Sequence, residues 1–155
     1  MKIILFSFFL IVSVLPSFAQ EQDLLLQNVT AEKDTNKRID LMIASFLRLD
    51  INLQLTQKNN QEILLQSQKK KDKIVEAIAL SVFGQSFRLA GNPLKGLEYN
   101  YKALDIAGQT GNKKVIAVIK NQLGNIYAER GDYKKAIELY QWNVSLASDS
   151  NAANV

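Results

Sequence analysis

A pattern of glycines, helix caps and aromatic residues that recurs after 40 residues is the feature that most constrains the fold of this chain. When the sequence is shifted by that distance, Gly84 falls on Gly124 and Gly91 falls on Gly131. The other matched pairs are Asp72 and Asn112, Phe87 and Tyr127, Asn92 and Asp132, Lys95 and Lys135, Glu98 and Glu138, and Ala107 and Ala147. Because caps, glycines and aromatics share one period, the pattern indicates a structural repeat.

Each repeat carries the signals of two helices joined by a tight turn. Apolar residues recur at helical spacing within residues 74–82 and 115–123, and Pro93 is the one proline beyond the first 20 residues. Gly91 and Gly131 suit the left-handed position that ends a helix. Residues of the N-cap type are Asp72, Asn92, Asn112 and Asp132, and Asn59 with Glu62 fits a capping box. The sequence therefore predicts an all-α chain.

Two helices of one repeat cannot bury both of their apolar faces alone, so neighbouring repeats must stack. We therefore expect an α-solenoid of antiparallel helix pairs. The expected divisions are 1–19, a signal peptide; 20–33, an N-terminal lead-in; 34–71, a degenerate helical repeat; 72–111 and 112–150, two clear repeats; and 151–155, the start of a further, truncated repeat.

Gly124 lies inside a predicted helix, where glycine costs about 1 kcal/mol relative to alanine. Such a glycine is best tolerated where another backbone approaches closely, and Gly84 stands at the equivalent place. We expect Gly124 to face the partner helix of its own repeat, with Ala136 opposite.

The first 19 residues have the build of a secretory signal peptide. Lys2 precedes an apolar stretch from Ile3 to Leu15, and Ser17-Phe18-Ala19 supplies the small residues of a cleavage site. The stretch is shorter than the ~20 residues that span a bilayer as a helix. The sequence predicts cleavage after Ala19 and export to the periplasm or the medium; a buried core helix or an uncleaved anchor is the alternative.

Six residues of the second clear repeat carry a family resemblance: Leu123, Gly124, Tyr127, Gly131, Ala136 and Tyr140. In this order and spacing they resemble the tetratricopeptide repeat, in an exported bacterial form with longer helices than the usual period of about 34 residues. The preceding repeat matches less fully, through Phe83, Gly84, Phe87 and Gly91. The positions that depart from the family pattern are Gly96, Asn100, Lys120 and Asn143.

Composition excludes several kinds of chemistry. The sequence has no cysteine and no histidine, so it has no thiol nucleophile, thiolate zinc site or imidazole acid–base catalyst. Carboxylates such as Glu98, Asp105, Glu129 and Glu138 are spread along helices, where solvated positions are the rule. No phosphate-binding glycine motif is present. We predict no enzyme activity, no cofactor and no metal site.

The predicted binding surface is the concave face, which first helices line in stacked repeats. On the side of each first helix that faces away from its partner, we expect Ser81, Gln85, Arg88, Asn121 and Asn125. Residues one turn apart share a stripe, and amide side chains both donate to and accept from a peptide backbone. The family resemblance implies that these positions hold a peptide; hydrated polar residues with no ligand are the alternative.

The sequence thus favours an exported, non-enzymatic protein whose partner is a protein or peptide. A modest net charge of +4 without interleaved aromatic residues gives no support to nucleic-acid binding. The alternative is the N-terminal sensor segment of a longer membrane-bound signalling protein, a histidine kinase or transcriptional regulator. In that case the membrane would be reached through a further C-terminal part. The sequence does not define an oligomeric state.

Overall fold

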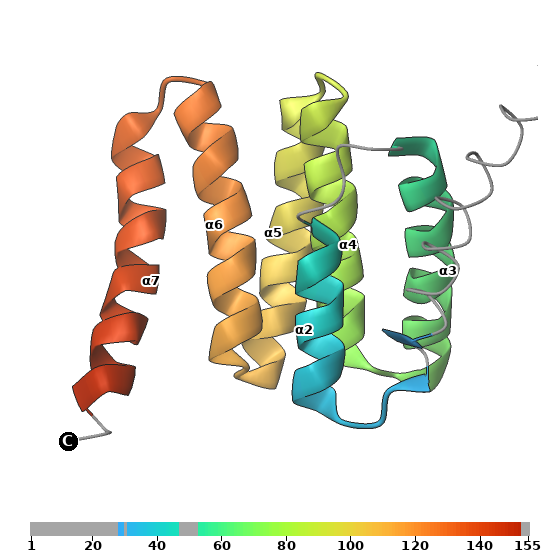
Figure 1. The fold of residues 1–155 in the computed structure, drawn as a ribbon. Coiled ribbons are helices and arrows are strands. Elements are labelled where there is room, and N and C mark those ends of the chain that lie inside the picture. Colours follow the sequence, from blue (N-terminus) through green and yellow to red (C-terminus); the bar gives the residue numbers. More distant parts are fainter. Residues whose placement is uncertain (1–27, 30, 47–52, 153–155) are drawn as a thin grey trace, which may run out of the picture.

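The computed structural model describes residues 28–29, 31–46 and 53–152, and every regular element within these ranges is an α-helix (Figure 1). The helices are α2 (Thr35–Phe46), α3 (Leu53–Lys70), α4 (Lys73–Leu89), α5 (Pro93–Thr110), α6 (Lys113–Glu129) and α7 (Tyr133–Ala152). The predicted all-α class is confirmed for this part of the chain. The predicted signal peptide lies outside the described residues.

The helices follow the 40-residue period closely. Helices α4 and α6 begin at Lys73 and Lys113, and α5 and α7 begin at Pro93 and Tyr133. Helix α7 continues without a break to Ala152, so the prediction that a further repeat starts at residue 151 is wrong for residues 151 and 152. Residues 153–155 lie outside the described ranges.

The predicted N-caps are confirmed by hydrogen bonds from backbone N–H groups. The side chains of Asp72, Asn92, Asn112 and Asp132 each accept from the N–H three residues further on, at 3.1–3.2 Å. These bonds satisfy donors that the first helical turn leaves without an intrahelical partner. The predicted capping box at Asn59 is wrong, because Asn59 lies inside α3, which already begins at Leu53.

Left-handed residues end α3, α4 and α6 in the same way. Gly91 has a φ of 78° and Gly131 a φ of 81°, as predicted for helix-terminating glycines. The N–H of Gly91 donates to the carbonyl of Arg88, and the N–H of Asn92 donates to that of Phe87. These two bonds satisfy the last carbonyls of α4 in the Schellman arrangement. The same pair of bonds closes α3, but there the left-handed residue is Lys71.

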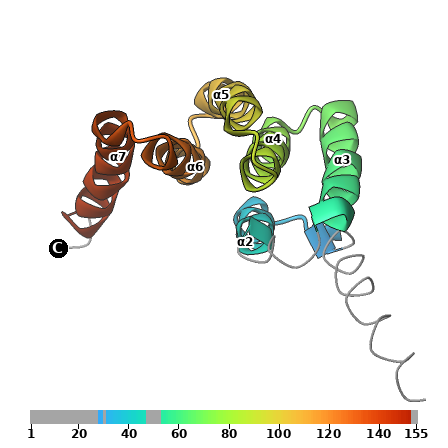
Figure 2. The same ribbon diagram turned by 90° about the horizontal axis from the view of Figure 1, so that it is seen from above.

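Helix α4 occupies the centre of the array. It packs against α2, α3, α5 and α6, whereas α7 packs mainly on α6 (Figure 2). The first helices α2, α4 and α6 lie on one side, and the second helices α3, α5 and α7 surround them on the other (Figure 2). This is the arrangement of an α-solenoid, in which each pair is covered by its neighbours.

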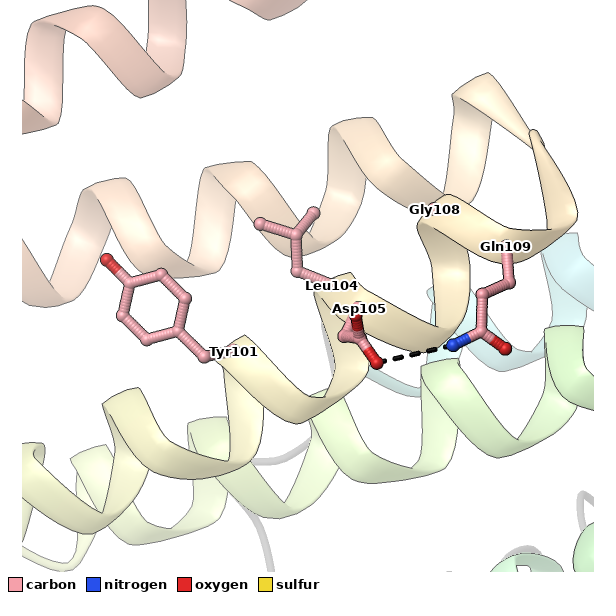
Figure 3. Close-up of a pocket in the computed structure, with 5 residues that line it drawn as sticks. All are labelled: Tyr101, Leu104, Asp105, Gly108 and Gln109. Carbon is pink, nitrogen blue, oxygen red and sulfur yellow. Dashed lines mark hydrogen bonds between the residues drawn. The ribbon is translucent and has the colours of Figure 1, made fainter.

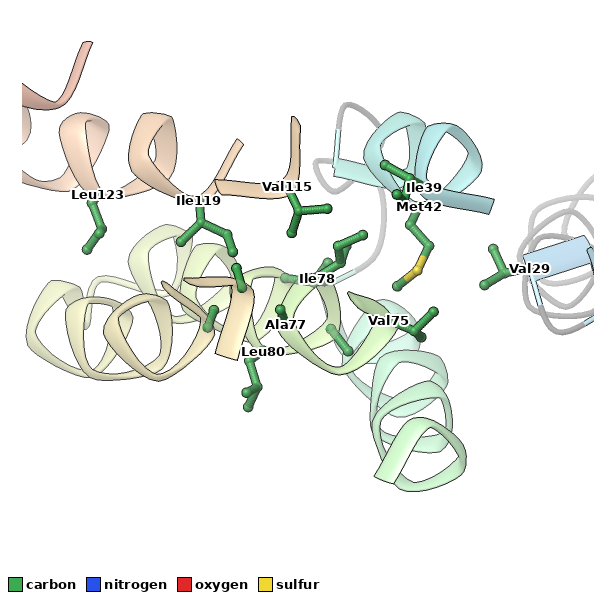
Figure 4. Close-up of a cluster of buried hydrophobic side chains, with 14 residues drawn as sticks. Val29, Ile39, Met42, Val75, Ala77, Ile78, Leu80, Val115, Ile119 and Leu123 are labelled. Carbon is green, nitrogen blue, oxygen red and sulfur yellow. The ribbon is translucent and has the colours of Figure 1, made fainter. Parts of the chain in front are cut away.

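The core forms where the three first helices meet (Figure 4). Ile39 of α2, Ile78 of α4 and Ile119 of α6 are each at most 1% exposed and belong to one apolar cluster. Val29 joins the same cluster from the segment before α2. The cluster thus holds α2 to the two repeats that follow it, and α3 also packs on α4.

Close contacts at glycine positions hold the two helices of each clear repeat together. A Cβ atom on Gly124 would lie 2.5 Å from Cε1 of Tyr140, on the partner helix α7. Gly124 therefore faces its partner helix, as predicted, and the nearest side chain there is Tyr140. In the preceding pair a Cβ on Gly84 would lie 2.9 Å from the carbonyl oxygen of Gly96.

Two departures from the family pattern become contacts between α6 and α7. The ammonium group of Lys120 lies 4.0 Å from the ring centroid of Trp142, a cation–π distance. Burial lowers the pKa of this lysine. The amide of Asn143 donates to the carbonyl oxygen of Ala117 at 3.1 Å. Both polar side chains thus stabilise the helix pair at positions where the family has smaller or apolar residues.

We predict that Gly124→Ala lowers the free energy of unfolding by about 1–3 kcal/mol, because the new methyl group meets the Tyr140 ring and overpacks the contact. Gly108→Ala is the matched control, since a Cβ there meets nothing within 4 Å. This control should raise stability by roughly 0.5–1 kcal/mol, the helix preference for alanine. Urea unfolding followed by circular dichroism measures both. A Gly124→Ala variant as stable as the control would contradict the close contact.

We also predict that Lys71→Gly stabilises the protein by about 1 kcal/mol. Lys71 has a φ of 56°, a conformation that costs a residue with a Cβ roughly 1–2 kcal/mol and costs glycine little. Lys70→Gly, inside the last turn of α3, is the control and should destabilise the helix. Equal effects of the two substitutions on the urea midpoint would argue against the left-handed geometry.

Candidate functional site

The sequence predicts five binding residues on the inner side of the array, which is formed by α2, α4 and α6 (Figure 2). Three of the five lie on α4 and two on α6. The structure places them in quite different surroundings, so they do not form one open stripe.

Ser81 does not face away from its partner helix, and the prediction for it is wrong. It is 0% exposed, and its hydroxyl donates to Oδ1 of Asn100 on α5 at 2.7 Å. The amide of Asn100 in turn donates to the carbonyl oxygen of Gly96 at 2.9 Å. The absence of side-chain bulk at Gly84 and Gly96 brings α4 and α5 close enough for this buried polar network, in which every bond is made inside the pair.

Gln85 and Arg88, the other two residues of α4, are also largely withdrawn from solvent. Gln85 is 9% exposed. Arg88 is half-buried, and its guanidinium forms an ion pair with Glu129 at the end of α6. Arg88 therefore joins the two clear repeats, and only its partner Glu129 is well exposed. Gln85 and Arg88 therefore do not form an exposed polar stripe on α4.

The two predicted residues on α6 are more accessible than those on α4. Asn121 is exposed, as predicted. Asn125, one turn further on, is half-buried, and its Oδ1 accepts a hydrogen bond from the hydroxyl of Tyr140 at 2.7 Å. The side chain of Asn125 thus already bonds to the partner helix α7. The side-chain carbonyl and NH2 groups of Asn121 both remain available to solvent or a ligand.

Four polar side chains gather where α4, α6 and α7 approach one another: Arg88, Asn125, Glu129 and Tyr140. Burial raises the pKa of Tyr140, the negative charge of Glu129 adds to this shift, and Arg88 opposes it. The hydroxyl therefore stays protonated at neutral pH and acts as a donor. The cluster presents a cation, a carboxylate and an amide at one end of the inner side.

Gln122 is a buried polar residue that our sequence reading missed. It is 8% exposed, and its Oε1 has no hydrogen-bond partner among the described residues. The equivalent position in the preceding repeat is Val82, which is apolar and buried. The exchange of an apolar for a polar residue between matched positions is the sequence signal that could have identified it.

A second concave feature lies on helix α5, a shallow pocket of about 560 Å³ (Figure 3). Its lining comes from one face of that helix: Tyr101, Leu104, Asp105, Gly108 and Gln109. The hydroxyls of Tyr101 and Tyr127 lie 2.8 Å apart, and burial together with this hydrogen bond raises the pKa of Tyr101. The charged residue of the lining is Asp105, whose Oδ2 accepts a hydrogen bond from the amide of Gln109 at 3.3 Å.

The described residues contain no group of three or more acidic or other metal-ligating side chains placed to hold a metal ion. Nor does this part of the chain contain a helix of the length and apolar character needed to cross a membrane. The polar groups that the predicted site does contain are amides and the Arg88–Glu129 ion pair.

The fold and this surface define an α-solenoid of antiparallel helix pairs. Residues 75–147 match the family model of the tetratricopeptide repeat. The family resemblance seen in the sequence is thus confirmed for residues 75–147, which carry the tetratricopeptide repeat pattern. No curated protein and no solved structure matches the chain significantly.

A double-mutant cycle tests the bond between the α6 amide and the α7 phenol. Asn125→Ala and Tyr140→Phe should each lower the free energy of unfolding by about 1 kcal/mol, since each removes one half-buried hydrogen bond. Because the two changes remove the same bond, the double variant should lose less than the sum. Additive losses in urea unfolding would show that the two side chains act independently.

Proposed function

We propose that this chain is a non-enzymatic interaction protein that holds a protein or peptide segment along the inner side of α6. The observation that carries the proposal is Asn121, an exposed amide on the accessible first helix of a tetratricopeptide pair. An amide both donates and accepts, so it pairs with a peptide backbone of any sequence.

The surroundings of Asn121 support a backbone ligand. Asn125 lies one turn away on the same helix, and the Arg88–Glu129 ion pair follows near the end of α6. A peptide that runs along α6 would meet an amide first and then a cation and a carboxylate. We infer that Ser81 and Gln85 contribute to the stability of the array and do not contact this ligand, because both are buried.

The binding test uses a peptide library displayed on phage, selected on the immobilised protein. The affinities of the selected peptides are then compared between the wild type and Asn121→Ala. Loss of one or two backbone hydrogen bonds should weaken binding by roughly tenfold. Lys134→Ala, an exposed residue on α7, is the control and should bind as the wild type does.

Two results would contradict the proposal. Peptides whose affinity depends on Lys134 and not on Asn121 would place the ligand on the outer helices. If no two selected peptides compete with each other for the protein, then α6 does not provide a shared binding surface.

We further propose that the protein acts outside the cytoplasm, after removal of residues 1–19. The support is the sequence alone: an apolar stretch followed by Ser17-Phe18-Ala19. N-terminal sequencing of the protein recovered from the periplasm or medium should give Gln20 as the first residue. Recovery of the chain with Met1 in the membrane fraction would support the uncleaved anchor instead.

A further inference from the structure

One end of the array collects most of its lysines. This basic end consists of the residues before and at the start of α2, the turn from α3 to α4, and the turn from α5 to α6, which lie together at the lower end of the array in Figure 1. Its exposed lysines are Lys33, Lys37, Lys69, Lys70, Lys71, Lys73, Lys113 and Lys114. Three chain segments far apart in sequence thus contribute to one charged surface.

Two ion pairs connect these segments. Arg38 at the start of α2 pairs with Asp72 before α4, at 2.8 Å. Lys114 at the start of α6 pairs with Asp40 of α2. The two ion pairs thus link the three segments into one surface.

The carboxylates at this end do not balance the cations. They are Glu32, Asp34, Asp40, Asp72 and Glu76. Three of them already have a cation partner: Lys114 pairs with Asp40, Arg38 with Asp72, and Lys73 with Glu76. Asp34 accepts from the backbone N–H groups of Asn36 and Lys37. The lysines that form no ion pair among the described residues are Lys33, Lys37, Lys69, Lys70, Lys71 and Lys113.

Lys71 adds an independent observation. It is the one described residue other than glycine with a positive φ, and the three comparable helix ends have Gly91, Gly111 and Gly131. The chain keeps a lysine at a position whose backbone favours glycine. Strain of this kind points to a role for the side chain, since the strained backbone by itself lowers stability.

We propose that the basic end docks on an anionic lipid surface, with the helices roughly perpendicular to the membrane. Clusters of four to eight lysines or arginines are the pattern that anionic headgroups attract. Lysine is a compact, strongly hydrated point charge, which suits a diffuse layer of headgroups better than it suits a shaped partner. In this orientation the inner side of α6 stays open to solvent, so docking does not compete with the ligand proposed above.

The make-up of the surface favours lipid over other polyanions. None of the large apolar residues exposed on the described chain lies in the three segments of the basic end. A protein interface is usually anchored by a buried aromatic or aliphatic side chain, and single-stranded nucleic acid is held by aromatic stacking. This proposal differs from the sequence-based expectation that the chain reaches a membrane only through a further C-terminal part.

The test is co-sedimentation of the chain from Gln20 onward, which contains every described residue, with lipid vesicles at low salt. The wild type should sediment with vesicles of phosphatidylglycerol and phosphatidylcholine in equal parts, and not with phosphatidylcholine alone. Added salt should release it, because exposed charges are screened. The triple variant Lys69→Gln, Lys70→Gln, Lys113→Gln should bind at least tenfold more weakly.

The matched control removes three charges elsewhere, through Lys58→Gln, Arg130→Gln and Lys134→Gln, all exposed and without ion pairs among the described residues. This control should keep its affinity within about threefold. Lys71→Gly gives a second test, because it should weaken vesicle binding while raising the urea midpoint. Misfolding would lower the urea midpoint, so it cannot produce this combination.

Three outcomes would overturn the proposal. Equal losses in the two triple variants would show that net charge alone drives binding. Competition by polyglutamate or single-stranded DNA as effective as that by anionic vesicles would show a general polyanion attraction. No sedimentation of the wild type with anionic vesicles would exclude lipid docking. Asn121→Ala should bind vesicles normally, so failure here is distinguishable from failure of the peptide proposal.

Discussion

The close approach of the two helices within each clear repeat is the constraint on which the rest of the structure depends. Gly84 and Gly96 remove two side chains from the α4–α5 contact, and Gly124 makes room for the ring of Tyr140 between α6 and α7. Glycine inside a helix lowers helix propensity, so the pairs are stabilised by tertiary packing and not by the helices individually. The stacked core of Ile39, Ile78 and Ile119 then holds the pairs to one another.

The two clear repeats solve the same packing problem with different chemistry. In the α6–α7 pair, an aromatic ring fills the space above the helix glycine and its hydroxyl reaches Asn125. In the α4–α5 pair, Asn100 stands at the matched position and is 0% exposed, with bonds to Ser81 and Gly96. A buried amide is tolerated there because its partners are all inside the pair.

This difference explains what could and could not be predicted from the sequence. Caps, turn glycines and helix pairs depend on neighbouring residues, so Asp72, Asn112 and Gly131 were predicted correctly. The orientation of Ser81 depends on Asn100, 19 positions away, which bonds to it only because α5 comes so close. On α6, the residue that matches Ser81 is Asn121, and it is exposed as predicted. Similarly, Asn59 is a residue type that is common at N-caps, but α3 begins at Leu53 and continues past it.

The unequal packing of the last helix has a consequence for local stability. Helix α7 packs mainly on α6, and Ile137 and Val144 on its outer side are 52% and 68% exposed. The equivalent residues of α5, Leu97 and Leu104, are partly buried against the core. In a stacked array each unit is stabilised by its neighbours, so the free energy of local opening should decrease from α4 toward α7. Amide hydrogens of α7 would then exchange with solvent through opening of that helix alone, while those of α4 would require the whole array to unfold.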